Sequence, residues 1–241
     1  MRYLILSDLH ANLPALEAVL DNAAGGYDAV LVLGDLVGYG ADPSAVLSQT
    51  LALEPVGLIR GNHDKVCAGL EPSTSFNDIA RISIEWTAET LSASELKTLA
   101  ELRKGPQQIP GGIEIAHGAP FDEDYYVFDT ADAARALQAA SARLCLIGHT
   151  HVPGIYATGE LSAGAVEGNT VRLPATGQVL ANVGSVGQPR DGDPRAAYGL
   201  LDLAKKTLSM RRVKYDVERA QQSILQAGLP SLLAWRLEEG Q

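Results

Sequence analysis

The sequence opens with Met1-Arg2-Tyr3-Leu4-Ile5-Leu6-Ser7-Asp8-Leu9-His10, a short apolar run that ends in an aspartate and a histidine. Such a run is typical of a buried β-strand. On an extended backbone, side chains two positions apart point to the same side, so Asp8 and His10 can approach one cation together. A single pair of this kind is weak support for a metal site, because Asp-x-His often occurs by chance.

The arrangement recurs along the chain. Every histidine lies in a short polar block, and four of the five blocks follow directly on an apolar, strand-like run. The blocks are Ser7-Asp8-Leu9-His10, Leu33-Gly34-Asp35, Arg60-Gly61-Asn62-His63-Asp64, Ala116-His117-Gly118 and Gly148-His149-Thr150-His151. Histidines that served only core packing would be scattered along the chain. The alternative that they are ordinary core residues would have to explain all five at once. The blocks therefore predict a metal centre.

The first sixty residues predict a βαβαβ unit. The expected elements are strands at 2–7, 29–33 and 56–59 and helices at 13–23 and 43–52. Units of this kind are parallel and right-handed almost without exception, so the residues after their strands meet at one edge of the sheet. We expect the polar side chains that follow these strands to converge there, namely Asp8, His10, Asp35, Asn62 and His63.

The middle of the chain predicts covering helices followed by two further strands. Apolar residues recur at helical spacing between 66 and 104, and Ser92-x-x-Glu95 is a capping box. The loop at 71–77, which contains Phe76, could instead border a substrate. Short apolar runs at 113–116 and 144–147 predict strands that each deliver a histidine.

The last third changes character. Short β-prone stretches separated by turns, such as Glu167-Gly168-Asn169, predict an antiparallel sheet within 154–213 that packs face to face on the first sheet. The stretches are 171–173, 179–183, 198–203 and 207–213. Asp216 can cap a closing helix, and an apolar segment at 232–237 either packs on the core or forms a dimer contact.

Composition limits the possible functions. With 241 residues and 46% hydrophobic content, the chain can form a single domain over 1–241. Cys67 and Cys145 are too few for a disulfide framework, and the first apolar run is too short for a signal peptide or a membrane span, so we expect a cytoplasmic protein that does not bind membranes. The net charge of −10 disfavours nucleic acid as a partner and favours a small or metal-assisted substrate.

The blocks supply enough donors for two divalent cations with four ligands each. The donors are two carboxylates, one amide and four imidazoles, from Asp8, Asp35, Asn62, His10, His117, His149 and His151. Asp35, on a turn after Gly34, could place its two oxygens on two different cations. Because no thiolate is present, the set favours Mn, Fe, Zn, Co or Ni over Cu(I) or an iron–sulfur cluster.

In this order, the five blocks resemble the signature motifs of the calcineurin-like metallophosphoesterases. Asn182-Val183-Gly184-Ser185, followed by Pro189-Arg190, is similar to a stretch of the small prokaryotic branch of that family. The resemblance covers more than half of the chain. It implies an α/β fold of four layers, an αββα sandwich in which two mixed β-sheets are flanked by helices.

The resemblance also implies roles for individual residues. One metal would bind Asp8, His10, Asp35 and His151, and the other would bind Asp35, Asn62, His117 and His149. The family's activity would then be hydrolysis of phosphomonoesters or phosphodiesters of small substrates such as nucleotides, by attack of a metal-bound hydroxide. His63 is left free to donate a proton to the departing alkoxide or to steady the phosphate.

The chain departs from the protein-phosphatase pattern G-D-x-V-D-R-G, because it reads Gly34-Asp35-Leu36-Val37-Gly38-Tyr39-Gly40. Neither the phosphate-binding arginine nor the carboxylate behind the catalytic histidine is present, so the group that orients His63 is undetermined. Arg60, Arg190 and Arg195 are candidate phosphate contacts, although each is equally consistent with a solvated or structural arginine. We expect Asp64 to steady the loop that carries His63.

The sequence also allows two other functions. One is a noncatalytic scaffold that keeps the fold for protein contacts; such proteins tolerate loss of ligands, and here none is lost. The other is a nuclease, which the acidic charge and the lack of a basic, aromatic-rich stretch disfavour. The sequence does not distinguish a monomer from a homodimer.

Overall fold

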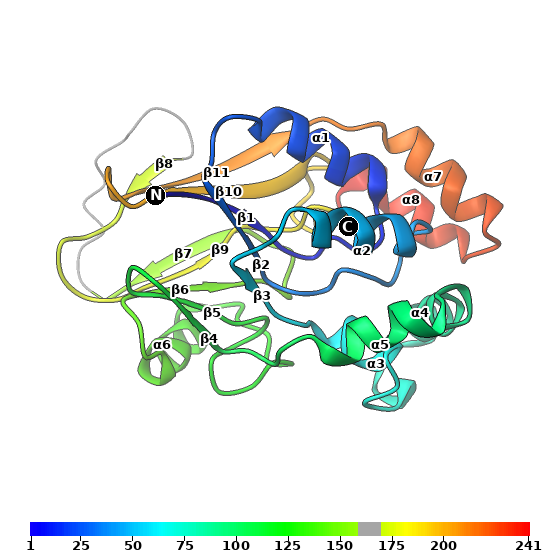
Figure 1. Cartoon of the computed structure of the whole chain (residues 1–241), viewed down its shortest axis with the longest axis horizontal. Coiled ribbons are helices and arrows are strands. Elements are labelled where there is room, and N and C mark those ends of the chain that lie inside the picture. Colours follow the sequence, from blue (N-terminus) through cyan, green and yellow to red (C-terminus); the bar gives the residue numbers. More distant parts are fainter. Residues whose placement is uncertain (159–169) are drawn as a thin grey trace.

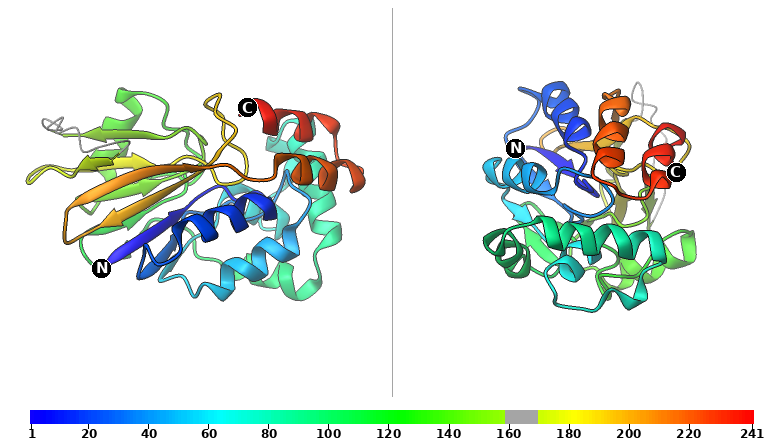
Figure 2. Two further views of the ribbon diagram at one scale, coloured as in Figure 1. Left: turned by 90° about the horizontal axis from the view of Figure 1, so that it is seen from above. Right: turned by 90° about the vertical axis from the view of Figure 1, so that its right-hand side faces the viewer.

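Two β-sheets lie face to face with helices on their outer sides (Figures 1 and 2). The computed structural model describes residues 1–158 and 170–241. The strands of the first sheet are β1 (Arg2–Leu6), β2 (Ala29–Val32), β3 (Gly57–Leu58), β8 (Thr170–Arg172), β10 (Ala196–Asp202) and β11 (Thr207–Val213). The strands of the second are β4 (Gln107–Ile109), β5 (Ile113–Ile115), β6 (Leu144–Ile147), β7 (Gly154–Ala157) and β9 (Val179–Asn182).

The first sheet has the order β3-β2-β1-β10-β11-β8, and the second has the order β4-β5-β6-β9-β7. Both sheets are mixed. In the first, β1, β2 and β3 are parallel, whereas β10 runs antiparallel to β1. In the second, β5, β6 and β9 are parallel, and β4 and β7 are antiparallel to their neighbours.

The helices are α1 (Leu13–Ala23), α2 (Pro43–Ala52), α3 (Asn62–Cys67), α4 (Asp78–Thr90), α5 (Ala93–Glu101), α6 (Thr130–Ala139), α7 (Val217–Gln226) and α8 (Ser231–Glu239), with one 3₁₀ turn at Ser73–Ser75. The predicted caps are confirmed: Asn12 accepts from the N–H of Ala15, and Ser92 with Glu95 forms a capping box. Within the two described ranges, no helix combines the length and apolar composition that crossing a bilayer requires.

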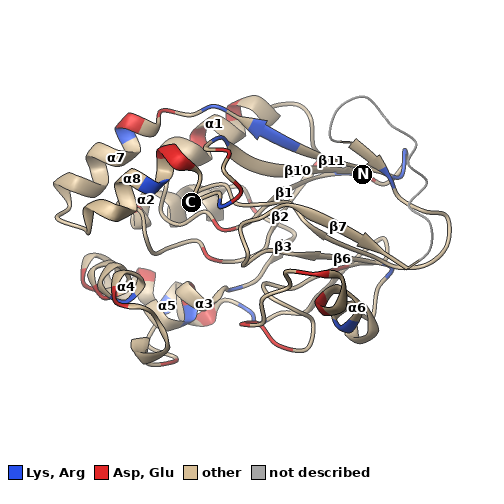
Figure 3. Ribbon diagram, turned by 180° about the vertical axis from the view of Figure 1, so that it is seen from behind, with Lys and Arg blue, Asp and Glu red and all other residues tan. Residues whose placement is uncertain are grey.

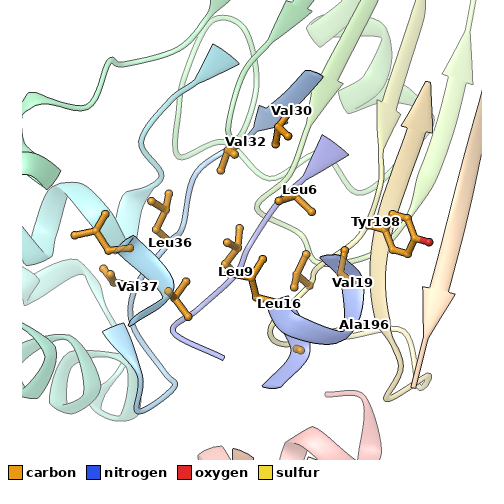
Figure 4. Packing of buried hydrophobic residues seen from close by; sticks show 14 of the residues in the cluster. Leu6, Leu9, Leu16, Val19, Val30, Val32, Leu36, Val37, Ala196 and Tyr198 are labelled. Atoms are coloured by element: carbon orange, nitrogen blue, oxygen red, sulfur yellow. The ribbon is translucent and has the colours of Figure 1, made fainter. Parts of the chain in front are cut away.

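Alternation along the central strands divides the core into two layers. Leu6 and Val32 lie in the cluster that contains Leu16 of α1 (Figure 4). Ile5 and Leu31, one position away in each strand, lie in the cluster between the two sheets. Because successive side chains of a strand point to opposite faces, each strand contributes to both layers. The uninterrupted apolar runs that predicted these strands thus reflect sheets covered on both faces.

The predicted αββα sandwich is confirmed. Helix α6 covers the outer face of the second sheet, where Ala136 and Leu137 pack with Cys145 and Leu180. Helices α7 and α8 lie beyond the strands, at one end of the molecule (Figures 1 and 2). There they pack with α4 and with Tyr39 of the loop after β2.

The predicted antiparallel sheet of residues 154–213 is wrong. Strands β8, β10 and β11 extend the first sheet beside β1, whereas β9 pairs in parallel with β6 in the second sheet. A β-prone stretch predicts a strand but does not identify its partner. All four residues of β9 are buried, as expected for a strand covered on both faces. The turn predicted at Glu167-Gly168-Asn169 lies outside the described residues.

The core predicts a measurable difference between two leucines. Leu31 is fully buried between the sheets, whereas Leu51 of α2 is 38% exposed. We expect Leu31→Ala to lower the free energy of unfolding by about 2–5 kcal/mol, because it opens a cavity. Leu51→Ala should change it by less than about 0.5 kcal/mol. Urea denaturation followed by circular dichroism measures both, and equal losses would contradict this description of the core.

Candidate metal centre

The polar blocks meet where parallel strands of both sheets end. Asp8 and His10 follow β1, Asp35 follows β2, and Asn62 begins α3 just after β3. His117 follows β5, and His149 and His151 follow β6. All seven side chains are buried. The two sheets are joined at this point, because Asp8 Oδ1 accepts a hydrogen bond from the backbone N–H of His149 at 3.1 Å.

A first group of candidate ligands consists of Asp8, His10, Asp35 and His151. One ligand atom from each lies within 4.8 Å of all the others. His10 Nε2 is 3.0 Å from His151 Nε2 and 3.5 Å from Asp35 Oδ2, and His151 Nε2 is 3.4 Å from Asp8 Oδ1. These are the four residues expected to share one metal.

A second group consists of Asp35, His117 and His149, whose ligand atoms also lie within 4.8 Å of one another. His117 Nε2 is 3.4 Å from Asp35 Oδ2 and 3.1 Å from His149 Nδ1. The amide oxygen of Asn62 is 3.3 Å from the same His117 nitrogen. The structure thus brings together all seven residues, and Asp35 lies in both groups.

Each of the four histidines directs its other ring nitrogen at a backbone carbonyl. The pairs are His10 Nδ1 with Val37 O at 3.1 Å, His117 Nδ1 with Leu33 O at 2.8 Å, His151 Nδ1 with Gln188 O at 2.6 Å and His149 Nε2 with Asp124 O at 3.1 Å. A carbonyl only accepts, so these nitrogens carry the protons. In a neutral ring the nitrogen that faces the centre then has a free lone pair, which is the form that binds metal.

The arrangement fits cations. His10 and His151 are neutral, because burial holds the pKa of each well below its usual value. Their Nε2 lone pairs therefore face each other across 3.0 Å and repel unless a positive charge lies between them. In the second group, burial opposes a charge on His117, but the carboxylates of Asp35 and Asp8 outweigh it and raise its pKa to about 10. Positive charge is thus favoured in both groups.

Backbone strain is concentrated at the same place. Among the described non-glycine residues with positive φ, five are candidate ligands: Asp8, His10, Asp35, His149 and His151, with φ between 46° and 68°. Left-handed backbone at such residues costs of the order of 1–3 kcal/mol each and persists at functional sites. The turns that aim these side chains inward are therefore held by their surroundings.

Asp64 is one of the groups that hold these turns, as predicted. Its carboxylate accepts hydrogen bonds from the backbone N–H groups of Leu36 and Val37 at 2.8 and 3.2 Å, and from that of Gly61 at 2.9 Å. The side chain is fully buried. It thereby ties the loop that carries Asp35 to the loop that carries Asn62.

His63 lies beside the first group without belonging to it. Its ring centroid is 4.4 Å from that of Tyr39, 4.7 Å from that of Phe76 and 4.8 Å from that of His10. Its backbone N–H donates to Asp35 Oδ1 at 2.9 Å. Burial lowers the pKa of His63 to about 4, and its buried Nδ1 has no hydrogen-bond partner among the described residues.

Aromatic packing therefore orients His63 in place of the carboxylate that the sequence lacks. Gly38, with φ +83°, completes this pocket, because a Cβ atom at that position would collide with His63 Nδ1. Phe76 belongs to the loop at 71–77, which the sequence suggested could border a substrate. Its ring contacts His63 at the site.

The three candidate arginines have different surroundings. Arg60 pairs with the buried Glu123 at 3.0 Å, and the exposed Arg195 pairs with Asp193 at 2.6 Å. Arg190 alone contacts the site, since its Cζ lies 5.6 Å from the centroid of the Tyr39 ring. Its Nη2 donates to Gln188 Oε1 at 3.0 Å.

Sequence reasoning missed two aromatic residues of the site. Tyr39 contacts both His10 and His63. It was missed even though it lies in the stretch Gly34–Gly40 that was compared with the protein-phosphatase pattern. Tyr126 stacks on His149 with ring centroids 3.8 Å apart, and Phe128 stacks on Tyr126. The available signal was a run of aromatic residues shortly after the His117 block.

Comparison with known proteins agrees with this geometry. A sequence profile of the calcineurin-like phosphoesterase superfamily domain matches residues 1–206. The chain belongs to the calcineurin-like phosphoesterase superfamily. The resemblance seen in the sequence is thus confirmed.

Two solved structures and one curated protein match almost the whole chain. The crystal structure of a metallophosphoesterase from Sphaerobacter thermophilus has 37% sequence identity and a TM-score of 0.88, and the match covers 100% of this chain and 99% of that one. A hypothetical protein from Pyrococcus horikoshii shares the fold, with 20% identity, a TM-score of 0.81 and coverage of 100% and 98%. An uncharacterized protein of Methanocaldococcus jannaschii is 31% identical over 97% of this chain and 96% of its own.

The shared position of Asp35 generates a prediction. Asp35→Asn keeps the size of the side chain but removes the charge that both groups use, so we expect divalent-metal uptake to fall at both. His63→Ala should leave uptake unchanged, because His63 is not in either group. Elemental analysis after gel filtration measures both variants, with Asp78→Asn as the control at an exposed carboxylate. Equal metal loss in the Asp35 and His63 variants would show that these roles are misassigned.

Proposed function

We propose that this protein hydrolyses phosphomonoester or phosphodiester bonds of small substrates with the help of two divalent cations. The observation that carries the proposal is the pair of ligand groups that share Asp35, with an unligated histidine beside them. One cation would be held by Asp8, His10, Asp35 and His151. The other would be held by Asp35, Asn62, His117 and His149.

The donor set of nitrogen and oxygen atoms suits Mn, Fe, Zn, Co or Ni. When bound, such a pair of cations would lower the pKa of water, bind phosphate oxygens and neutralise charge that develops during in-line attack on phosphorus. The chain then has no need of a nucleophile of its own. Both cysteines are buried, and burial raises the pKa of Cys67 to about 12, which makes it a poor nucleophile.

Three side chains would act on the substrate. His63, held between Tyr39 and Phe76, would take up a proton when the negative charge of a bound phosphate raises its low pKa, and would then donate that proton to the departing alkoxide or steady the phosphate. Arg190, which contacts the same tyrosine, would bind a phosphate oxygen. Because the rings of Tyr39 and Phe76 cover His63, they would also keep bulk water away from its imidazole.

The alternatives have less support. A noncatalytic scaffold does not require seven metal-ligand donors whose side chains and lone pairs face one centre. The chain keeps this arrangement even though the left-handed backbone at five of these residues costs free energy. A nuclease needs a basic surface along which the phosphate backbone can lie, but the net charge is −10, and acidic and basic segments are interspersed (Figure 3).

Hydrolysis of two chromogenic esters tests the proposal. Protein loaded in turn with Mn, Co, Ni, Zn and Fe should cleave p-nitrophenyl phosphate, its bis ester or both. Failure on both esters with all five metals would exclude this function. Incubation with single-stranded and duplex oligonucleotides, read on a gel, tests the nuclease alternative in the same preparation.

His63→Ala should reduce turnover according to the leaving group. We expect a loss of about 10²–10⁴ in kcat for alkyl phosphates, whose alkoxide needs a proton. The loss should be smaller for p-nitrophenyl esters, because p-nitrophenolate leaves without one. Steady-state kinetics on both classes measures the difference. A uniform loss across leaving groups would indicate that His63 steadies the phosphate instead.

A second substitution moves His63 without removing it. Gly38→Ala places a Cβ atom against His63 Nδ1, so we expect kcat to fall at least about tenfold while metal content stays unchanged. The matched control is Gly69→Ala, because Gly69 has φ +74° but open space around its Cα, so that only backbone strain is added. Normal turnover in the Gly38 variant would show that the glycine does not position His63.

A further inference from the structure

The loop at 118–129, between the His117 block and α6, fixes the orientation of His149. The backbone carbonyl of Asp124 accepts a hydrogen bond from His149 Nε2 at 3.1 Å. The ring of Tyr126 stacks on the same imidazole, with centroids 3.8 Å apart. The carbonyl keeps the proton on Nε2 and so leaves Nδ1 free for a metal. The use of His149 as a ligand therefore depends on where this loop lies.

A buried lysine on α3 holds this loop in place. The side chain of Lys65 is only 3% exposed, and its Nζ donates to Asp124 Oδ2 at 2.6 Å and to Glu123 Oε1 at 3.3 Å. Burial disfavours the charge on Lys65, but its hydrogen bonds to Asp124 and to a further carboxylate outweigh it and raise its pKa. Because Asp124 binds Lys65 through its side chain and His149 through its backbone, one residue connects the lysine to the imidazole.

The same ammonium group also pairs with the other loop that contacts the site. Lys65 Nζ is 3.0 Å from Glu71 Oε2, in the loop at 71–77. This loop carries Phe76, one of the rings that orient His63. An ammonium group has three donors, which matches the three carboxylates around Lys65. The two loops are therefore joined to each other and to α3 through one side chain.

The link depends on Lys65 specifically. The buried Glu123 is also bound by Arg60, through two hydrogen bonds of 3.1 and 3.0 Å, so it stays paired without the lysine. By contrast, no other cation pairs with Asp124 or Glu71 within the part of the chain that the structure describes. Removal of the ammonium group would leave both of these carboxylates without a partner and release the loops that carry them.

We propose that Lys65 is a positioning residue, which ties the loops at 71–77 and 118–129 to α3 and thereby holds His149 in the orientation that binds the second cation. The inference rests on the proposed function and deepens it, because it makes one of the two ligand groups depend on a side chain that is not itself a ligand. The first group does not contain His149 and should not depend on Lys65.

Manganese titration of the metal-free protein, followed by calorimetry, tests this role at each site separately. Lys65→Met keeps the length of the side chain but removes its charge and its donors. We expect it to weaken one manganese site roughly 10- to 100-fold, the scale found when a group that orients a ligand is lost, and to leave the other site unchanged. Lys65→Arg, which keeps a cation, should restore part of the affinity. Equal losses at both sites, or no loss, would overturn the proposal.

Replacement of the ligand itself identifies the affected site. His149→Ala removes the imidazole through which Lys65 is proposed to act. In a protein that already carries His149→Ala, Lys65→Met should therefore cause no further change in manganese affinity. A further loss of similar size would mean that the lysine acts by another route, and would overturn the proposal.

A second variant tests the connecting residue and perturbs the structure less. Asp124→Asn removes the carboxylate that Lys65 binds but keeps the backbone carbonyl, at a side chain that is 46% exposed. It should weaken the same manganese site, and Lys65→Met should have a smaller effect in its presence, because both substitutions break one link. Independent, additive effects would contradict the link. This variant also keeps the proposal testable if Lys65→Met does not fold.

Lys97→Met is the matched control, because Lys97 is exposed and pairs with the exposed Glu101 of the same helix at 3.7 Å. It removes the same charge far from both loops and should leave both manganese affinities unchanged. A loss as large as that of Lys65→Met would reduce the effect to net charge and overturn the proposal.

Limited proteolysis measures the loops without metal. Chymotrypsin cleaves after aromatic residues, and both loops contain them. In the metal-free protein, Lys65→Met should speed cleavage within both loops about tenfold, because cleavage follows the population of the open form, while Lys97→Met should not. Mass spectrometry of the peptides locates the cuts. Unchanged cleavage at both loops would show that Lys65 does not hold them.

These measurements are independent of turnover. The proposed function fails if the chromogenic esters are not cleaved, whereas the role of Lys65 fails if neither the affinity of one manganese site nor the protection of the loops depends on it. The two proposals can therefore be rejected separately.

Discussion

Two neutral histidine rings, His10 and His151, present their lone pairs to each other across 3.0 Å in the interior of the protein. In the tautomers that the backbone carbonyls favour, the two nitrogens repel each other, and a positive charge between them would make the contact favourable. Backbone carbonyls fix the tautomers by accepting from the opposite nitrogens, so neither ring can relieve the repulsion by turning. The rest of the structure is arranged around this constraint.

The fold meets the constraint by ending its strands at one place. β1 lies within the first sheet and β6 within the second, and each delivers an acidic or imidazole donor at its carboxyl end. The sheets are stacked, so donors that are far apart in the sequence become neighbours, as the hydrogen bond from His149 N–H to Asp8 shows. Left-handed turns aim the side chains inward, and Asp64 holds two of the loops together.

The convergence of Asp8, His10, Asp35 and Asn62 could be predicted from the sequence, because the βαβαβ rule brings the ends of β1, β2 and β3 together whatever the remaining topology is. Which of the two sheets each later strand joins could not be predicted from the sequence. The stretches that became β9 and β10 have the same β-prone character, yet one pairs with β6 and the other with β1. Strand partners are chosen by tertiary packing, which a single sequence does not display.

The surroundings of His63 were also beyond the sequence. Among the described residues no carboxylate partners the ring of His63, and the rings of Tyr39 and Phe76 hold the imidazole instead.

Anomalous diffraction from crystals soaked in manganese tests the central claim most directly. The account predicts two peaks about 3.5–4 Å apart, on either side of the Asp35 carboxylate, with His63 bound to neither. A site that stayed free of metal at saturating manganese, or a single ion bound by His63, would contradict it.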